Sequence, residues 1–284
     1  MLRLLTASLL FSILTPINAQ PLNPSWNGRW EGGDTTLIVT QKNVINQGKI
    51  CRWANKAPAG NFEGCLSHYA GGVKKSELME SFEAMRAVIK KQASSMDAAA
   101  KASAAKTVQA LKAKLDQLSN DTFRILTTSD ADYVGSGDCG AYYIMDKGVP
   151  YVVRQCESAG AEFALMVDPM QRATAPAALN AIDGRWHSPQ WKYGYELKDG
   201  VGTATATNSA KFKVGDEIIY LNPKGKNTFE GEQIYRNGKF NPITVTLLPD
   251  GKLQFNGKFN PTLLPDGTLQ FKGDKNITWT MVRQ

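Results

Sequence analysis

Cysteine and histidine could supply nucleophilic or metal chemistry, and this chain has few of either. It contains four cysteines and two histidines, His68 and His187. Cys65 precedes His68 by three positions, but a Cys–His nucleophile needs a free thiol, and we expect every cysteine to be paired. Zinc would need further ligands at a suitable spacing, and the sequence offers none. We therefore predict no catalytic residue, no metal site and no cofactor.

The sequence also lacks the usual short catalytic and nucleotide-binding motifs. The glycine-rich run at 135–140 does not have the Gly-X-Ser-X-Gly spacing of a nucleophile elbow. No phosphate-binding loop or dinucleotide fingerprint is present. The paired carboxylates of a glycoside hydrolase can lie far apart in sequence, so a hydrolase stays open as a third class of function. The sequence singles out no such pair.

The best candidate binding residues are aromatic. Trp191, Tyr193 and Tyr195 alternate with Lys192 and Gly194, so on a strand the three rings share one face. Such a row can stack on a sugar ring or line a pocket, with the hydroxyl groups as polar contacts. The alternative is ordinary core packing. We predict these three residues as the ligand-binding site.

The amino terminus predicts export. Arg3 precedes an apolar run at 4–14, Pro16 follows, and Ala19 is a small residue at the cleavage position. We expect a signal peptide over residues 1–19 and a mature chain beginning at Gln20. The apolar run is too short to span a bilayer, and no second long apolar run follows. We expect a periplasmic or secreted protein with no membrane span.

The distribution of charge along the sequence argues against a nucleic-acid partner. The formal charge is +7, from 33 Lys and Arg against 26 Asp and Glu, and 42% of the residues are hydrophobic. The basic excess is spread thinly, whereas a nucleic-acid face normally clusters it. The charge is compatible with anionic envelope polymers or with simple solubility.

Two short disulfides are expected in the oxidising compartment. Spacing favours Cys51–Cys65 and Cys139–Cys156. The second pair has a geometric argument, because 141–145 and 150–154 look like two strands of a hairpin. In that register Met145 faces Pro150, and the same register sets Cys139 opposite Cys156.

The first half of the chain mixes strands with helix. The residue pattern predicts strands at 36–40, 50–53, 122–128 and 162–167, and it predicts helix over 73–119. Two apolar stripes recur at helical spacing: Leu78, Phe82, Met85 and Ile89, then Val108, Leu111, Leu115 and Leu118. The stripes belong either to one long helix or to a helical hairpin with an N-cap at Asp97. A Pro- and Ala-containing stretch follows and is expected to be a linker.

The second half is predicted to be almost wholly β-strand, and it begins with a sequence motif that also begins the first half. Ile182-Asp-Gly-Arg-Trp186 repeats the pattern of Trp26-Asn-Gly-Arg-Trp30. Near the end, 239–257 and 258–273 repeat a Lys-Phe-Asn-Pro and Leu-Leu-Pro-Asp-Gly pattern. Pro-Asp-Gly favours a turn, so we interpret the repeat as a duplicated hairpin that extends a sheet.

A module that begins Gly-X-Trp, continues through hairpins and ends Trp-X-X-X-Arg resembles the lipocalin-like (calycin) barrels. In that family the early Trp packs across the closed end of the barrel beneath an Arg from near the last strand. The resemblance covers about residues 182–284 and implies those roles for Gly184, Trp186 and Arg283.

We therefore predict an α+β protein: a signal peptide at 1–19, an α+β domain at 20–168 with a helical hairpin and disulfide-bonded strands, a linker at 169–181, and an antiparallel lipocalin-like β-barrel at 182–284. The leading function is an exported, non-enzymatic binding protein of the bacterial envelope. Its partner would be a small apolar molecule, a glycan or an envelope protein. The alternative is a periplasmic inhibitor or immunity protein against a wall-degrading enzyme or toxin.

Overall fold

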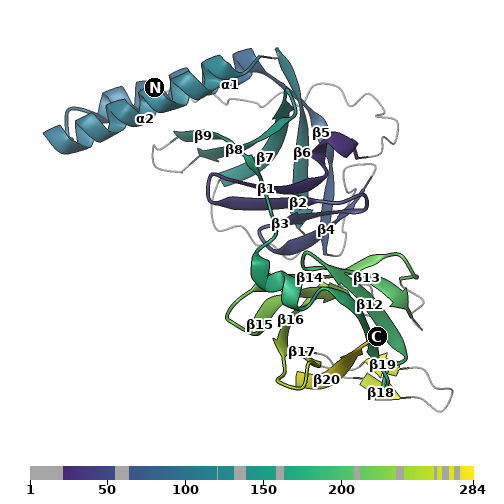
Figure 1. Ribbon diagram of the computed structural model, residues 1–284. Coiled ribbons are helices and arrows are strands. Elements are labelled where there is room, and N and C mark those ends of the chain that lie inside the picture. The colour runs from purple at the N-terminus through teal and green to yellow at the C-terminus, as the bar shows by residue number, and fades with distance from the viewer. Residues whose placement is uncertain are drawn as a thin grey trace.

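The computed structural model describes residues 22–54, 64–119, 121–130, 139–157, 163–207, 212–234, 240–258, 261–263, 269–271 and 276–284. They form two β modules, drawn one above the other in Figure 1. The upper module is a ten-stranded sheet and the lower one is a closed barrel. The predicted signal peptide at 1–19 lies outside the described residues.

The first module is a sheet that almost closes on itself. Its strand order is β10-β1-β2-β3-β4-β5-β6-β7-β8-β9, and only Met170 separates β9 from β10. The last stretch of strand therefore returns to pair with the first. The strands are β1 Gly28–Gly32, β2 Thr35–Val39, β3 Asn43–Asn46, β4 Lys49–Trp53, β5 Cys65–Lys74, β6 Thr122–Asp130, β7 Cys139–Asp146, β8 Val149–Glu157, β9 Phe163–Pro169 and β10 Gln171–Ala173.

Two helices are inserted between β5 and β6. They are α1 Lys75–Gln92 and α2 Ala98–Gln117, so the sequence forms two helices and not one. Asp97 is the N-cap of α2, as predicted, and accepts a hydrogen bond of 2.7 Å from the main-chain NH of Ala100. Leu78, Phe82, Leu111 and Leu115 are buried, whereas the Ala-rich start of α2 is exposed. The helices lie side by side and extend beyond the sheet (Figure 1).

The predicted α+β class is wrong. The described residues are mostly strand, and both modules are built around a closed or nearly closed β-sheet. The two helices are an insertion into the first sheet. Their buried residues belong to one of its two hydrophobic clusters and are absent from the other. The prediction failed because a long helical stretch dominates the hydrophobic pattern, whereas the short strands on either side of it give a weaker signal.

The second module is a closed barrel in the order β11-β12-β13-β14-β15-β16-β17-β20, all antiparallel. This architecture is compatible with a lipocalin-like barrel. The barrel strands are β11 Gly184–Ser188, β12 Tyr193–Lys198, β13 Val201–Ala206, β14 Glu217–Pro223, β15 Thr228–Ile234, β16 Phe240–Leu247, β17 Leu253–Lys258 and β20 Asn276–Arg283.

The duplicated hairpin is only half incorporated into the barrel. The first copy forms β16 and β17, as expected. The second copy forms β18 Pro261–Leu263 and β19 Leu269–Phe271, which make a separate two-stranded sheet. The expectation that it extends the sheet is therefore wrong. The second copy lacks the counterpart of Ile243-Thr-Val245, so its first strand is too short to span the barrel.

Each module has a closed end, and the two closed ends are built in the same way. Short 3-10 helices, η1 Pro24–Trp26 and η2 Ala177–Ala181, precede β1 and β11. The indole NH of Trp30 donates to the carbonyl of Trp26, and that of Trp186 to the carbonyl of Ile182, each at 2.7 Å. The sequence motif repeated at 26–30 and 182–186 therefore forms the same local structure in both modules.

An arginine from the end of each module covers that tryptophan. The Cζ atom of Arg283 lies 4.7 Å from the ring centroid of Trp186, as the resemblance implied. Arg172 occupies the same place in the first module, 5.0 Å from the ring of Trp30. Gly28 and Gly184 have φ values of 131° and 128°, a conformation that favours glycine.

The predicted cysteine arrangement is confirmed for one disulfide and for the hairpin register. Cys51 and Cys65 are bonded and join the neighbouring parallel strands β4 and β5. In the β7–β8 hairpin, Met145 pairs with Pro150 and Cys139 is directly opposite Cys156. The side chains of these last two residues lie outside the described set, so their disulfide stays a prediction.

The modules contact each other through β3–β4 and the outer face of the barrel. Tyr220 of β14 is buried against Ile38, Ile45 and Ile50. Polar contacts surround this cluster. The side-chain amide of Asn43 donates to Glu217 at 2.9 Å, and Lys42 forms an ion pair with Asp216 at 3.3 Å. The range predicted as a linker contains β10 and η2, and each belongs to a module.

Among the described residues, no helix is both long and apolar enough to cross a membrane.

Candidate functional site

Trp191 and Tyr193 lie at the end of the barrel where β11 finishes and β12 begins, which we call the open end. η2 packs at the opposite end, and Trp186 is the direct cross-strand partner of Tyr195. Trp191 is in the turn that leads into β12, Tyr193 is the first residue of that strand, and Tyr195 follows two positions later. The three residues therefore run from the rim of the barrel into its interior.

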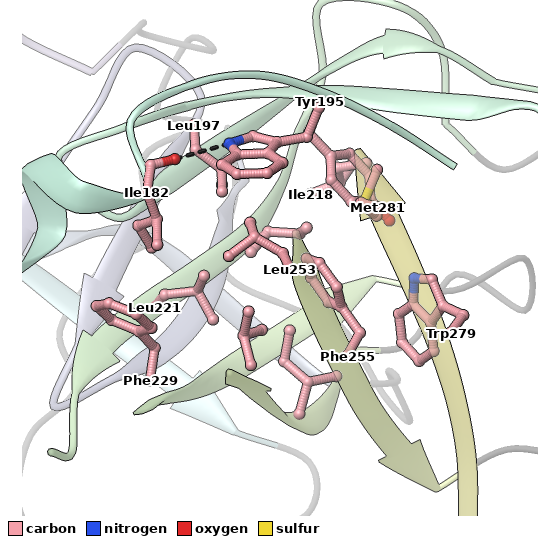
Figure 2. Packing of buried hydrophobic residues seen from close by; sticks show 14 of the residues in the cluster. Ile182, Tyr195, Leu197, Ile218, Leu221, Phe229, Leu253, Phe255, Trp279 and Met281 are labelled. Carbon is pink, nitrogen blue, oxygen red and sulfur yellow. Dashed lines mark hydrogen bonds between the residues drawn. The ribbon is translucent and has the colours of Figure 1, made fainter. Parts of the chain in front are cut away.

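The barrel interior is filled by side chains. The indole NH of Trp186 donates to the carbonyl oxygen of Ile182, and Figure 2 shows Leu221, Leu253, Phe255 and Trp279 packed in the same interior. Trp186, Phe229 and Phe255 are all fully buried. A ligand that enters from the open end consequently meets packed rings near the rim.

Tyr195 and its two aromatic neighbours differ in exposure. Tyr195 is 0% exposed and belongs to the core, whereas Trp191 and Tyr193 are half-buried and pack against that core. The hydroxyl oxygen of Tyr195 accepts a hydrogen bond from the side-chain amide of Gln233 on β15. Tyr195 therefore supports the site from beneath, and the other two rings are the accessible ones.

The rings form a continuous chain of contacts. Centroids lie 5.2 Å apart for Tyr193 and Tyr195, 6.1 Å for Tyr195 and Phe255, and 5.1 Å for Phe255 and Trp279. These separations fall within the range at which aromatic pairs attract each other. A ring that stacked on Tyr193 would extend this chain outward by one member.

Gly194 explains how the sequence produces this arrangement. A β-bulge lies between Gly194 and Tyr195 in the pairing with β13. A Cβ atom at Gly194 would lie 2.8 Å from the hydroxyl oxygen of Thr205 and 2.9 Å from the carbonyl oxygen of Trp186. Only glycine fits this close approach, and the bulge re-aims the residues on either side.

Two buried polar atoms near the open end lack a hydrogen-bond partner among the described residues. They are the side-chain carbonyl oxygen of Gln233 and the hydroxyl oxygen of Ser188, which pairs across the ladder with Tyr193. Buried polar atoms are normally satisfied, so each is suited to a ligand group or a water molecule. Sequence analysis missed both residues. The alternation from Trp186 to Ser188 was the available signal that Ser188 faces inward.

The residues considered for catalysis do not come together. Cys65 is in a disulfide, and His68 is buried in the first module, where burial lowers the pKa of its imidazole. His187 lies in the barrel strand β11. Among the residues that the structure describes, no group of three His, Cys, Asp or Glu side chains could hold a metal ion.

The chain matches no protein-family model, no curated protein and no solved structure. Its function must therefore be inferred from the fold and from the geometry of the barrel mouth.

Proposed function

We propose that this chain is an exported, non-enzymatic binding protein of the lipocalin-like class that holds a small, planar, largely apolar molecule at the open end of its second barrel. Trp191 and Tyr193 contact the ligand, and Tyr195 supports Tyr193 from within. The series of aromatic contacts that ends at the half-buried Tyr193 carries this proposal.

The filled interior limits the size and depth of the ligand. Trp186, Phe229 and Phe255 leave the ligand to bind at the rim, so it is smaller or flatter than one that fills a hollow barrel. The hydroxyl oxygen of Ser188 and the carbonyl oxygen of Gln233 are buried beneath the rings. A ligand at the rim therefore binds through contact with the aromatic rings.

The disulfide supports export. Cys51–Cys65 joins two neighbouring strands, and such bonds persist in the periplasm or outside the cell. The lipocalin-like class is supported by the closed eight-stranded barrel, by the buried Trp186 and by Arg283 over its ring.

The alternative of an inhibitor receives less support from the structure. A rigid protruding loop would favour it, and the β7–β8 turn is the relevant candidate. That turn has two residues, Lys147 and Gly148, and the preceding Asp146 is buried and bound to Ser119 at 2.6 and 2.9 Å. The turn is thus held close against the end of α2.

Equilibrium titration with the neutral fluorescent probe N-phenyl-1-naphthylamine tests the proposal. Wild-type protein should show saturable binding of one probe per chain. Trp191→Ala should weaken it by about tenfold, which corresponds to about 1.4 kcal/mol. Tyr142→Ala, which removes a half-buried tyrosine from the first module, is the control. Unsaturable binding, or equal weakening in both variants, would contradict the proposal.

A further inference from the structure

A groove of about 810 Å³ lies where the β3–β4 turn meets the outer face of the barrel. Gln47, Gly48 and Lys49 form one wall, and β14–β17 supply the floor. Ligand sites in proteins commonly have volumes of about 300–1,000 Å³. The groove is outside the barrel and separate from its open end, so a ligand here would be additional to the one proposed for the barrel mouth.

The floor carries an in-register row of polar side chains. Asn222 pairs with Glu230, Glu230 with Thr244, Thr244 with Asn256, and Asn256 with Thr278. The row therefore crosses β14, β15, β16, β17 and β20. Neighbouring strands are about 4.8 Å apart, so the row presents a hydrogen-bonding group at each such step.

Existing hydrogen bonds fix the orientation of the two asparagine amides. The carbonyl oxygen of Asn222 accepts from the hydroxyl of Tyr220 at 2.6 Å, and that of Asn256 accepts from Thr278 at 2.5 Å. Both amide NH₂ groups, which only donate, are therefore directed away from these contacts.

The two glutamates are each held through Oε2. That atom of Glu232 accepts from the main-chain NH of Ile50 at 2.9 Å, and that of Glu230 accepts from Lys224 at 2.5 Å. A carboxylate offers about four lone-pair sites, so each group can accept further hydrogen bonds. The groove thus combines oriented donors with oriented acceptors, and a hydroxyl group can bond to both kinds at once.

Charge in and beside the groove is balanced. Lys49 and Lys224 offset Glu230 and Glu232, and the other polar residues of the floor are uncharged. A phosphate or sulfate ligand would need an excess of cations, which the groove does not offer. The exposed Pro242 provides apolar surface against which the carbon atoms of a sugar ring can pack.

We propose that this groove binds a neutral, hydroxyl-rich chain, namely a linear oligosaccharide that lies along the polar row with the β3–β4 turn against one side. Contacts between the modules hold that turn in place. Ile50, next to the turn, is buried against Tyr220 and bonds to Glu232. The site is consequently preformed, which lowers the entropic penalty of binding a flexible glycan.

Thr244 and Thr246 give a matched pair of variants. They lie two positions apart on β16, both are half-buried, and only Thr244 lines the groove. Thr244→Val and Thr246→Val each replace a hydroxyl by a methyl on the same face of the same strand. The experiment is isothermal titration calorimetry of the full mature chain with linear oligosaccharides of β-1,4-glucose, β-1,4-N-acetylglucosamine and α-1,4-glucose, up to millimolar concentration.

The expected result is that at least one oligosaccharide binds, that Thr244→Val weakens it by roughly three- to tenfold, and that Thr246→Val leaves affinity unchanged. Thr244→Arg, which places a long side chain over the floor, should abolish binding. The proposal is overturned if no oligosaccharide binds the wild type, if both valine variants weaken binding equally, or if Thr244→Arg still binds while its melting temperature is unchanged. Because Trp191→Ala should not alter oligosaccharide affinity, this experiment separates the groove from the barrel mouth.

Discussion

The rings of Tyr193 and Tyr195 lie 5.2 Å apart with their planes tilted by 45°, yet one ring is at the rim and the other is fully buried. The pair therefore connects the accessible surface of the barrel mouth to its core. Contact with a ligand is available to Tyr193, and the loss of Tyr195 would leave a void among Phe255 and its neighbours.

Stability should separate the two tyrosines. Tyr195→Ala removes a buried ring and should lower the free energy of unfolding by about 3–5 kcal/mol. Tyr193→Ala removes a half-buried ring and should lower it by no more than about 1.5 kcal/mol. Urea unfolding of the full mature chain, followed by tryptophan fluorescence, measures both. Equal losses would show that Tyr193 is as much a core residue as Tyr195.

The two arginines that cover tryptophans should contribute alike. Arg283 also donates to the carbonyl of Ala181 at 2.9 Å, and Arg172 to that of Asn27 at 2.7 Å. We expect Arg172→Ala and Arg283→Ala each to lower the unfolding free energy by about 1–2 kcal/mol. Arg185, whose ion pair with Glu196 is exposed, is the control, and Arg185→Ala should cost less than about 0.5 kcal/mol. Equal losses of unfolding free energy in all three variants would contradict the equivalent roles of Arg172 and Arg283.

The cysteines should form two short-range disulfides. Non-reducing peptide mapping should recover Cys51–Cys65 and, from the register of β7 and β8, Cys139–Cys156. The Cys51→Ser/Cys65→Ser double variant opens a loop with a sequence separation of 14 and should lose about 3 kcal/mol. A crosslink between one β4–β5 cysteine and one hairpin cysteine would contradict the predicted pairing.

Stability should fall in mild acid because of His68. Burial lowers its pKa in the folded protein, so the unfolded chain takes up a proton first as the pH falls. The contribution of His68 is complete above the unfolded pKa of about 6.5 and declines below it. Melting temperatures between pH 8 and 5 should drop less in His68→Gln than in wild type. Parallel curves for the two proteins would rule out this role.

Local sequence signals predicted several elements correctly. Asp97 precedes a helical stripe and is the N-cap, and the spacing around Met145 and Pro150 set the hairpin register. These features depend on residues close in sequence. Arg172 was missed because its role depends on a tryptophan of the first strand, and the partner becomes visible only when β10 pairs with β1.

The aromatic row shows why periodicity is insufficient for the site. Alternation placed Trp191, Tyr193 and Tyr195 on one face of a strand, but it could not tell which ring is accessible. Strand β12 begins at Tyr193, and the bulge after Gly194 interrupts the regular alternation. Local sequence patterns cannot predict the groove, because it depends on the register of five strands and on contacts between the two modules.

The most direct test of ligand binding at the barrel mouth is the dissociation constant of N-phenyl-1-naphthylamine for Tyr193→Ala relative to Tyr142→Ala, with both variants measured at a temperature where each is fully folded. If Tyr193 forms the floor of a ligand site, its loss should raise the constant by about tenfold, equivalent to about 1.4 kcal/mol, and Tyr142→Ala should match wild type. An unchanged constant in a folded Tyr193→Ala protein would contradict the claim that the barrel mouth binds a ligand through this ring.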